Sequence, residues 1–377
     1  MSDLFEPAPA TDRLCRAHQR AVAVLFVVLL AAAPVLYFTC APMRTLASVS
    51  APSWSDGGVE AFRSGEFMDR WDTHLKESSP LTVALRGWLN ESLYRAGLLD
   101  GERVVLGRQG WMYLRETVTE NPNMAQRTAV RQAGLRGLRD EVDRLGLSLL
   151  VVLVPDKASV YPEFLPAGRL PAERVDRCVR IAAELRDLGF ECMTLLEPFL
   201  AYKHECPGEL LYYRRDTHWA MPAAWLAGEL VRQRLLRLGW LQRAGPVRDF
   251  QNLVWLENAE LPNLVEMLGI RPASSLANSL LVPKQHMGFQ HGDGRSYLDP
   301  NPEAVVALAG TSFSAGGLHR SLPHQLVRSV DCTGAIPGGG MVRGLLHVLD
   351  AIRGGRLPNC KIVVWEVVES VYAGYGW

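Results

Sequence analysis

The chain lacks the cysteine and histidine spacings that hold a metal ion. Its seven cysteines form no Cys-x-x-Cys pair, and no His-Glu-x-x-His occurs. These are the spacings by which zinc sites are recognised. We therefore expect neither a metal nor another cofactor. If residues beyond the N-terminal apolar segment lie in an oxidising compartment, five cysteines could form up to two disulfides: positions 178, 192, 206, 332 and 360.

A net charge is also absent. Forty Lys and Arg side chains balance forty Asp and Glu, and no basic block occurs. Proteins that bind nucleic acid present a basic patch to the phosphates, so nucleic acid is not an expected partner. With 377 residues, the chain is long enough to bury a sizeable core.

An uncharged apolar run lies near the N-terminus. Residues 21–39 have about the length needed to cross a bilayer, although Pro34 interrupts them. Three arginines in residues 1–20 precede the run, so the positive-inside rule makes residues 1–20 a cytoplasmic tail. A cleaved signal peptide is the alternative. Because no clean Ala-x-Ala site follows, we favour an uncleaved transmembrane anchor over residues 21–39.

Residues 40–99 are expected to link the anchor to a larger domain. Small and polar residues over 41–65 predict a stalk. Residues 67–99 predict one or two amphipathic helices, and their expected packing residues are Trp71, Leu75, Leu85, Leu89 and Leu93.

Helical and strand patterns alternate over residues 100–377. The expected strands are residues 149–154, 192–195, 303–309 and 361–368, and helical spacing occurs between them, including residues 341–352. Such alternation is typical of parallel strands joined by helices. The predicted fold is a three-layer α/β/α sandwich with a mainly parallel sheet.

Three residues have the types needed for an activated hydroxyl nucleophile. Ser312 is the candidate nucleophile, His218 the base that removes its proton, and Asp216 the acid that fixes the histidine tautomer. In an extended segment residues i and i+2 face one side, so Asp216 and His218 can reach one pocket. The pattern predicts acyl transfer.

The serine follows an apolar run, where Gly310 permits a sharp exit. In open α/β sheets, ligands bind at the carboxyl ends of strands. The backbone N–H groups of Ser312 and Phe313 are candidate oxyanion donors. Ser314 replaces the second glycine of a Gly-x-Ser-x-Gly elbow, so the sequence does not match that motif.

Each of these residues also has a simpler interpretation. Thr311 and Ser312 could form only a turn or a helix cap. Asp216 could cap a helix expected over residues 221–240, and His218 could be a surface residue. The joint occurrence of the three residues favours the catalytic interpretation.

Five motifs in order resemble those of the AlgJ and AlgX alginate O-acetyltransferases, relatives of the SGNH hydrolases that also include a cellulose-acetylation protein. The resemblance covers about residues 100–370, and the motifs are Gly110-Trp-Met-Tyr-Leu114, Val154-Pro-Asp-Lys157 with Val160-Tyr-Pro162, Asp216-Thr-His-Trp219, Gly310-Thr-Ser-Phe-Ser314 and Val363-Val-Trp-Glu366.

This resemblance implies an SGNH hydrolase-like catalytic domain over residues 100–377, with Asp216, His218 and Ser312 as its triad. It also implies a periplasmic O-acetyltransferase held in the bacterial inner membrane. A membrane-bound O-acyltransferase would supply the acetyl group, and an exopolysaccharide would accept it. The acceptor would be alginate or cellulose, and ten tryptophans with zero net charge favour a neutral polymer.

Several alternatives remain open at this point. A carbohydrate esterase would use the same triad with water as acceptor, and a non-catalytic scaffold of a polysaccharide export complex would not need the triad. Lys157 could contact substrate or be solvated, and Trp219 could stack on a sugar or pack in the core. The glycine run 338–340 could supply an oxyanion donor or only a turn.

Overall fold

The computed structural model describes residues 58–71, 80–99, 101–119, 124–241, 250–256, 261–271, 274–281, 285–291, 304–315, 330–335 and 341–373. The expected tail over residues 1–20 and the anchor over residues 21–39 lie outside these ranges. Within them, no helix combines the length and apolar character needed to cross a membrane. The chain divides into two units, one of residues 1–98 with 269–271, and one of residues 99–268 with 272–377.

In its described residues, the smaller unit has the helices α2 (Gly58–Arg63) and α4 (Pro80–Arg95). Helix α2 lies where the sequence predicted a stalk. The Arg271 guanidinium donates to both carboxylate oxygens of Glu91, over 2.9 and 3.1 Å. Leu85 and Leu89 of α4 are 50% and 51% exposed, so the prediction that they are packing residues is wrong.

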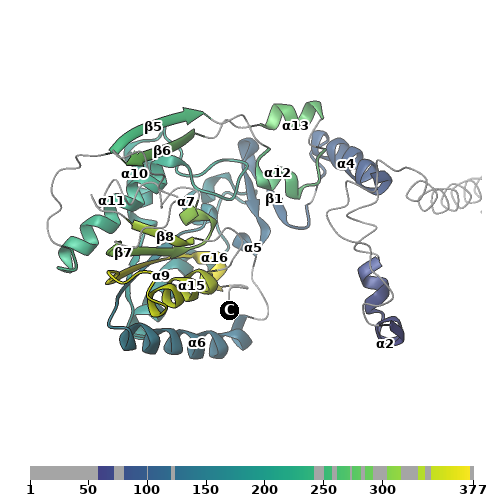
Figure 1. Cartoon of the computed structure of the whole chain (residues 1–377). Coiled ribbons are helices and arrows are strands. Elements are labelled where there is room, and N and C mark those ends of the chain that lie inside the picture. The colour runs from purple at the N-terminus through teal and green to yellow at the C-terminus, as the bar shows by residue number, and fades with distance from the viewer. Residues whose placement is uncertain are drawn as a thin grey trace, which may run out of the picture. The chain divides into compact units, whose positions relative to one another are not determined.

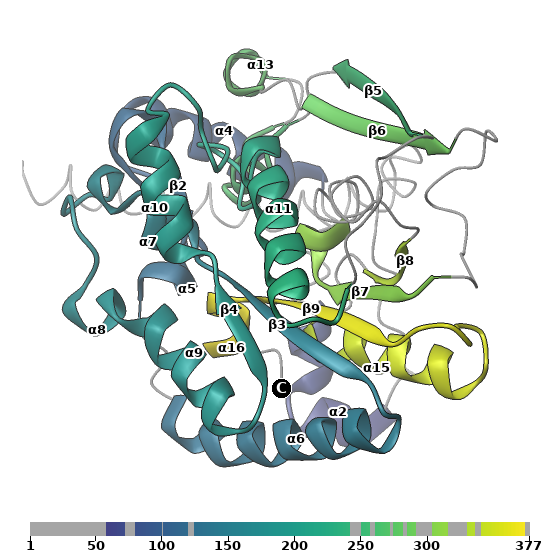
Figure 2. The ribbon, with the colours of Figure 1, turned by 90° about the vertical axis from the view of Figure 1, so that its left-hand side faces the viewer.

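The larger unit is built on a five-stranded parallel sheet with the order β4-β3-β9-β7-β8 (Figure 2). Its strands are β3 (Ser148–Val154), β4 (Glu191–Thr194), β7 (Val306–Gly310), β8 (Val330–Ala335) and β9 (Ile362–Val368). Strands buried on both faces carry apolar runs, as β3 does and as β9 does on either side of Glu366. The prediction of a parallel α/β sheet is confirmed.

Helices cover both faces of this sheet. Figures 1 and 2 show α6, α9 and α15 over one face and α10 and α11 over the other. These helices are α6 (Met124–Arg144), α9 (Arg177–Asp187), α10 (Leu196–Glu205), α11 (Met221–Arg237) and α15 (Met341–Arg353). Helix α9 buries Cys178, Ile181, Ala182 and Leu185, a spacing that places them on one helical face.

Shorter elements complete the unit. Two antiparallel pairs join β1 (Val104–Leu106) to β2 (Met112–Leu114), and β5 (Phe250–Leu256) to β6 (Gln285–His291). The remaining helices in the described residues are η2 (Arg108–Gly110), α5 (Arg115–Val118), α7 (Lys157–Val160), η3 (Pro162–Phe164), α8 (Ala172–Val175), α12 (Asn263–Met267), α13 (Ser275–Leu280) and α16 (Glu369–Ala373).

Three neighbouring strands position the site. Strands β3, β9 and β7 are parallel, so their carboxyl ends meet at one edge of the sheet. There β3 leads to Asp156 and α7, β7 leads to Ser312, and β9 leads directly into α16. Residues from distant parts of the sequence thus meet at this edge, as expected for a binding site in an open α/β sheet.

No disulfide joins any two of the four cysteines whose side chains are described, which are Cys178, Cys192, Cys206 and Cys360. The side chain of Cys332 lies outside the described part of the chain, and pairing that involves it stays a prediction.

Candidate active site

The structure brings Asp216, His218 and Ser312 together in one chain of hydrogen bonds. His218 Nε2 lies 2.8 Å from Ser312 Oγ, and His218 Nδ1 lies 2.7 Å from Asp216 Oδ1. In the tautomer that fits both contacts, the serine hydroxyl donates to Nε2 and Nδ1–H donates to the carboxylate. The Asp216 side chain is 1% exposed and that of His218 is 30% exposed. The acid is therefore shielded from water while the base is open to an incoming group.

The Asp216 carboxylate orients His218 rather than capping a helix. Helix α11 begins at Met221, and its N-cap residue, Ala220, makes no side-chain cap. Asp216 Oδ1 accepts the backbone N–H of His218 over 3.0 Å as well as the ring contact. The capping interpretation of Asp216 is wrong.

A residue that carried no motif, Asn263, holds the segment containing Asp216. The backbone N–H of Asn263 donates to Asp216 Oδ2 over 3.2 Å. Its side chain accepts the N–H of Thr217 over 2.9 Å and donates to Thr217 Oγ1 over 2.6 Å. Asn263 is separated from Thr217 by 46 residues. No local sequence pattern indicates a contact between residues this far apart in the sequence.

Lys157, the first residue of α7, supports the same segment. Its ammonium is buried and donates to the backbone carbonyls of Tyr213, Arg214 and Asp216, over 3.2, 3.2 and 2.8 Å. Burial lowers the pKa of Lys157 to about 7, and the negative charge of Asp216 opposes that shift. Lys157 is thus neither a solvated lysine nor a free cation for substrate, because its donors are directed at the segment that carries Asp216.

Glu366 of β9 holds the turn that carries Ser312. Its Oε2 accepts the backbone N–H groups of Thr311 and Ser314, over 2.7 and 3.2 Å, and their hydroxyls, over 2.9 and 3.0 Å. Glu366 is fully buried, and burial raises its pKa while these hydrogen bonds lower it. Sequence reasoning quoted Glu366 within a motif but gave it no role.

Close approach explains the glycine at position 310. A Cβ built on Gly310 would lie 2.4 Å from Ser314 Oγ and 2.5 Å from Glu366 Oε2. Gly310 does not adopt a positive φ, so space rather than backbone freedom requires it. The glycine lets the turn contact the Glu366 carboxylate.

One expected oxyanion donor already has a partner. The backbone N–H of Phe313 donates to Thr311 Oγ1 over 3.3 Å. The role of the Ser312 N–H stays a prediction, and the run 338–340 lies outside the described ranges.

The Trp219 ring lies in the core, not on a surface where a sugar could stack. It is 4% exposed, and its ring centroid lies 5.4 Å from that of Phe313. Phe313 in turn lies 5.1 Å from the His218 ring. These aromatic contacts confine the imidazole from one side.

A buried ionic cluster lies at the same sheet edge. Arg177 pairs with Asp156 and, over 2.7 Å, with Glu369. Asp156 Oδ1 also accepts the Ser370 hydroxyl over 2.7 Å. Burial and the neighbouring Glu369 raise the pKa of Asp156 to about 7, against the effect of Arg177. Across the described ranges, no group of three or more His, Cys, Asp or Glu residues could hold a metal ion.

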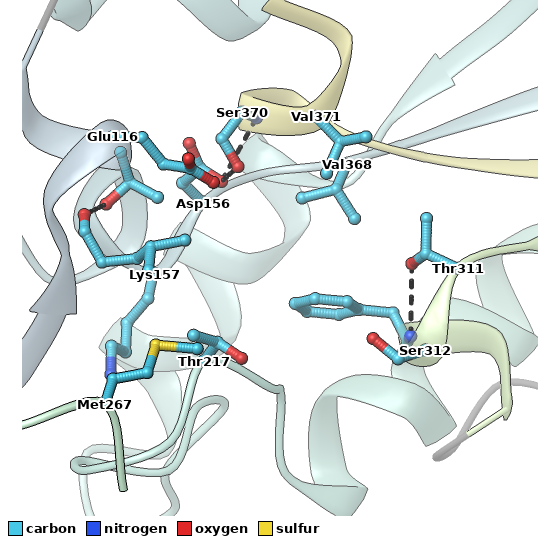
Figure 3. A pocket seen from close by; sticks show the side chains of 13 residues that line it. Glu116, Asp156, Lys157, Thr217, Met267, Thr311, Ser312, Val368, Ser370 and Val371 are labelled. Atoms are coloured by element: carbon cyan, nitrogen blue, oxygen red, sulfur yellow. Dashed lines mark hydrogen bonds between the residues drawn. The ribbon is translucent and has the colours of Figure 1, made fainter. Parts of the chain in front are cut away.

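A cavity of about 190 Å³ opens beside Ser312. Ser312 and Thr311 lie on one side of it, Glu116, Asp156 and Lys157 lie on the other, and Val368 and Val371 line the wall (Figure 3). Its other lining residues are Leu114, Thr117, Thr217, Met267, Phe313 and Ser370.

Comparison with known proteins assigns the family. Residues 104–369 match the family described as SGNH hydrolase-like domain, acetyltransferase AlgX. The chain belongs to this family. The resemblance predicted from the five motifs is confirmed, and so is the SGNH hydrolase-like fold.

Relatives of this chain are named as alginate O-acetylases. It is 25% identical to a probable alginate O-acetylase AlgJ of Pseudomonas putida, over 85% of this chain and 86% of the relative. With the probable alginate O-acetylase AlgJ of Pseudomonas aeruginosa it shares 26% identity, over 85% and 83%. The solved O-acetyltransferase domain of Pseudomonas putida AlgJ superposes with a TM-score of 0.60 at 25% identity, over 73% of this chain and 93% of that domain.

The contacts of Glu366 predict that its substitution lowers the reaction rate as well as the stability of the fold. Glu366→Ala removes the acceptor of the Thr311 N–H and of the Thr311 and Ser314 hydroxyls, so we expect a loss of about 2–5 kcal/mol of stability. We also expect kcat for an activated acetyl ester to fall at least about tenfold with little change in KM, because Ser312 loses its position. Glu366→Gln keeps a hydrogen-bond acceptor, so we expect smaller losses of stability and of kcat.

Denaturant unfolding and steady-state kinetics measure the two effects. Glu191→Ala, which removes a carboxylate from the less buried strand β4, is the matched control. A Glu366→Ala protein that remains folded with unchanged kcat would show that Glu366 stabilises the fold without positioning Ser312.

The lowered pKa of Lys157 predicts that the stability of the fold depends on pH. The folded chain loses the Lys157 proton near pH 7, whereas the unfolded chain keeps it to about pH 10.4. The unfolded state therefore binds more protons between these values, and this lysine's contribution to stability becomes more favourable as pH rises. We expect wild type to gain stability relative to Lys157→Met from about pH 7 to about pH 9.5.

Urea unfolding of both proteins across this range gives the difference directly. Lys361→Met, at an exposed position, serves as control and should show no such trend. A difference that stays flat with pH would contradict the lowered pKa of Lys157.

Proposed function

We propose that this protein is a membrane-anchored O-acetyltransferase that transfers acetyl groups to exopolysaccharide hydroxyls in the periplasm. The observation that carries the proposal is the hydrogen-bonded chain from Asp216 through His218 to Ser312. It occurs in a member of a family whose description is acetyltransferase. The roles of the three residues follow from their chemistry.

In the first half-reaction, Ser312 Oγ attacks the carbonyl carbon of an acetyl donor. Nε2 of His218 takes the hydroxyl proton, and Asp216 stabilises the imidazolium that forms. The donor's leaving group then departs with that proton, and an acetyl ester on Ser312 remains. By resemblance, a membrane-bound O-acyltransferase supplies this acetyl group.

In the second half-reaction, a sugar hydroxyl attacks the acetyl-serine. Its proton passes to His218 Nε2, and Ser312 leaves as an alkoxide that recovers the proton from the imidazolium. The 30% exposed His218 side chain offers an open side for this hydroxyl. Water in the same place would give an esterase, so water exclusion determines the outcome.

The acceptor follows from the relatives and from composition. The two relatives are named for alginate. The zero net charge and ten tryptophans of this chain instead favour a neutral glucan. We therefore propose an exopolysaccharide acceptor of one of these two kinds. Oligosaccharides of mannuronate and of glucose discriminate between them.

Acetylation of Ser312 tests the nucleophile. The chain given an activated acetyl ester should gain one acetyl group on the Ser312 peptide, and Ser312→Ala should abolish it because the nucleophilic oxygen is gone. Asp216→Asn should lower kcat by about 10⁴-fold, since the wrong histidine tautomer is then held.

Peptide mass spectrometry detects the label, and the acetylated product identifies the acceptor. Undiminished labelling of Ser312→Ala would refute the assignment. Rapid ester hydrolysis with no acetylated oligosaccharide, for either sugar, would favour the esterase alternative.

The anchor is tested by the mature N-terminus. Because residues 21–39 lack a clean cleavage site, we expect an intact N-terminus in the membrane fraction of producing cells. Fractionation followed by N-terminal sequencing measures this, with a protein lacking residues 1–39 as control. A cleaved, released form would contradict the anchor.

A further inference from the structure

We propose that the cavity beside Ser312 binds neutral acyl chains longer than acetyl, so that Ser312 also accepts propionyl and butyryl groups. This inference rests on the proposed function, because it requires Ser312 as the acylated residue. It concerns which acyl group this site can take.

The size of the cavity exceeds what acetyl needs. Its volume is about 190 Å³. An apolar cavity of about 150 Å³ in another protein holds benzene, which is much larger than an acetyl methyl group. An acetyl group on Ser312 would leave most of this space unfilled.

The chemistry of the wall suits an alkyl chain. The residues between Ser312 and the far side include Val368 and Val371, and Figure 3 shows both along the wall. Leu114, Met267 and Phe313 add further apolar surface. Each methylene group buried against such surface gains about 0.8 kcal/mol, which is roughly a fourfold increase in affinity.

The position of His218 separates the acyl side from the acceptor side. The acceptor hydroxyl must come within hydrogen-bond distance of His218 Nε2 to lose its proton. Among the described residues, Ser312 lines the cavity and His218 does not. The cavity is therefore available to the substituent on the acyl carbon.

The far side of the cavity disfavours an acyl chain that ends in a carboxylate. Glu116 and Asp156 line it, and the Lys157 ammonium is directed at three backbone carbonyls. Asp156 is already paired with Arg177, so the repulsion of such a chain comes from Glu116. A neutral alkyl chain avoids that repulsion.

A series of esters tests the inference on the full chain. The probes are p-nitrophenyl acetate, propionate and butyrate, with kcat/KM from p-nitrophenol release and acylation read on the Ser312 peptide. We expect kcat/KM for butyrate to be at least equal to that for acetate. A fall of more than about tenfold from acetate to butyrate would overturn the inference, since such a fall indicates an acetyl-sized site.

Substitutions at Val371 test whether the acyl chain lies in this cavity. Val371→Phe fills the cavity and should lower the butyrate-to-acetate ratio of kcat/KM about tenfold or more. Val371→Ala widens it and should raise that ratio. Val179→Phe, the same change at a position that is 54% exposed on α9, should leave the ratio unchanged.

The outcomes separate this inference from the proposed function. No acyl label on Ser312 with any ester would refute the proposed nucleophile. Acetyl labelling with a ratio that neither Val371 variant alters would overturn only the inference about the cavity.

Discussion

The geometry of Ser312 depends on a buried carboxylate beneath it. Glu366 accepts two backbone N–H groups and two hydroxyls from Thr311 and Ser314, which flank the serine. A fully buried carboxylate without such partners would be strongly unfavourable. The requirement works in both directions, because the carboxylate needs these donors and the donors need the carboxylate. Gly310 allows the contact, since a Cβ there would overlap both partners.

The other half of the triad is held by an independent set of contacts. Asn263 binds Asp216 and Thr217 from α12, and Lys157 binds three carbonyls of the segment that precedes and includes Asp216. Lys157 contacts backbone carbonyls, and Asn263 contacts Thr217 and Asp216 Oδ2, whereas the contact with His218 is made by Asp216 Oδ1. The loop is therefore positioned without displacing His218 from Asp216. A site held in this way keeps reacting groups close to a productive geometry before substrate binds.

The parallel sheet places these supports in reach of one another. Strands β3, β7 and β9 end at one edge of the sheet. Asp156, Ser312 and Glu369 follow these strands within two residues. The same edge forms the cavity wall with Val368 and Val371. One arrangement of strands therefore determines the position of Ser312, its support and the space beside it.

The sequence by itself determined four of the five strands of the parallel sheet, the fold class and the residue types of the proposed triad. Apolar runs and helical spacing are local properties, and the strands predicted at residues 149–154 and 361–368 match β3 and β9 to within one residue. Asp216, His218 and Ser312 were also recognisable, because few residue types can activate a hydroxyl. Only the tertiary structure decided the roles of Glu366, Asn263 and Lys157, the core position of Trp219, and the cavity. Each depends on contacts between segments far apart in the sequence, and such contacts leave no periodic pattern in the sequence around them.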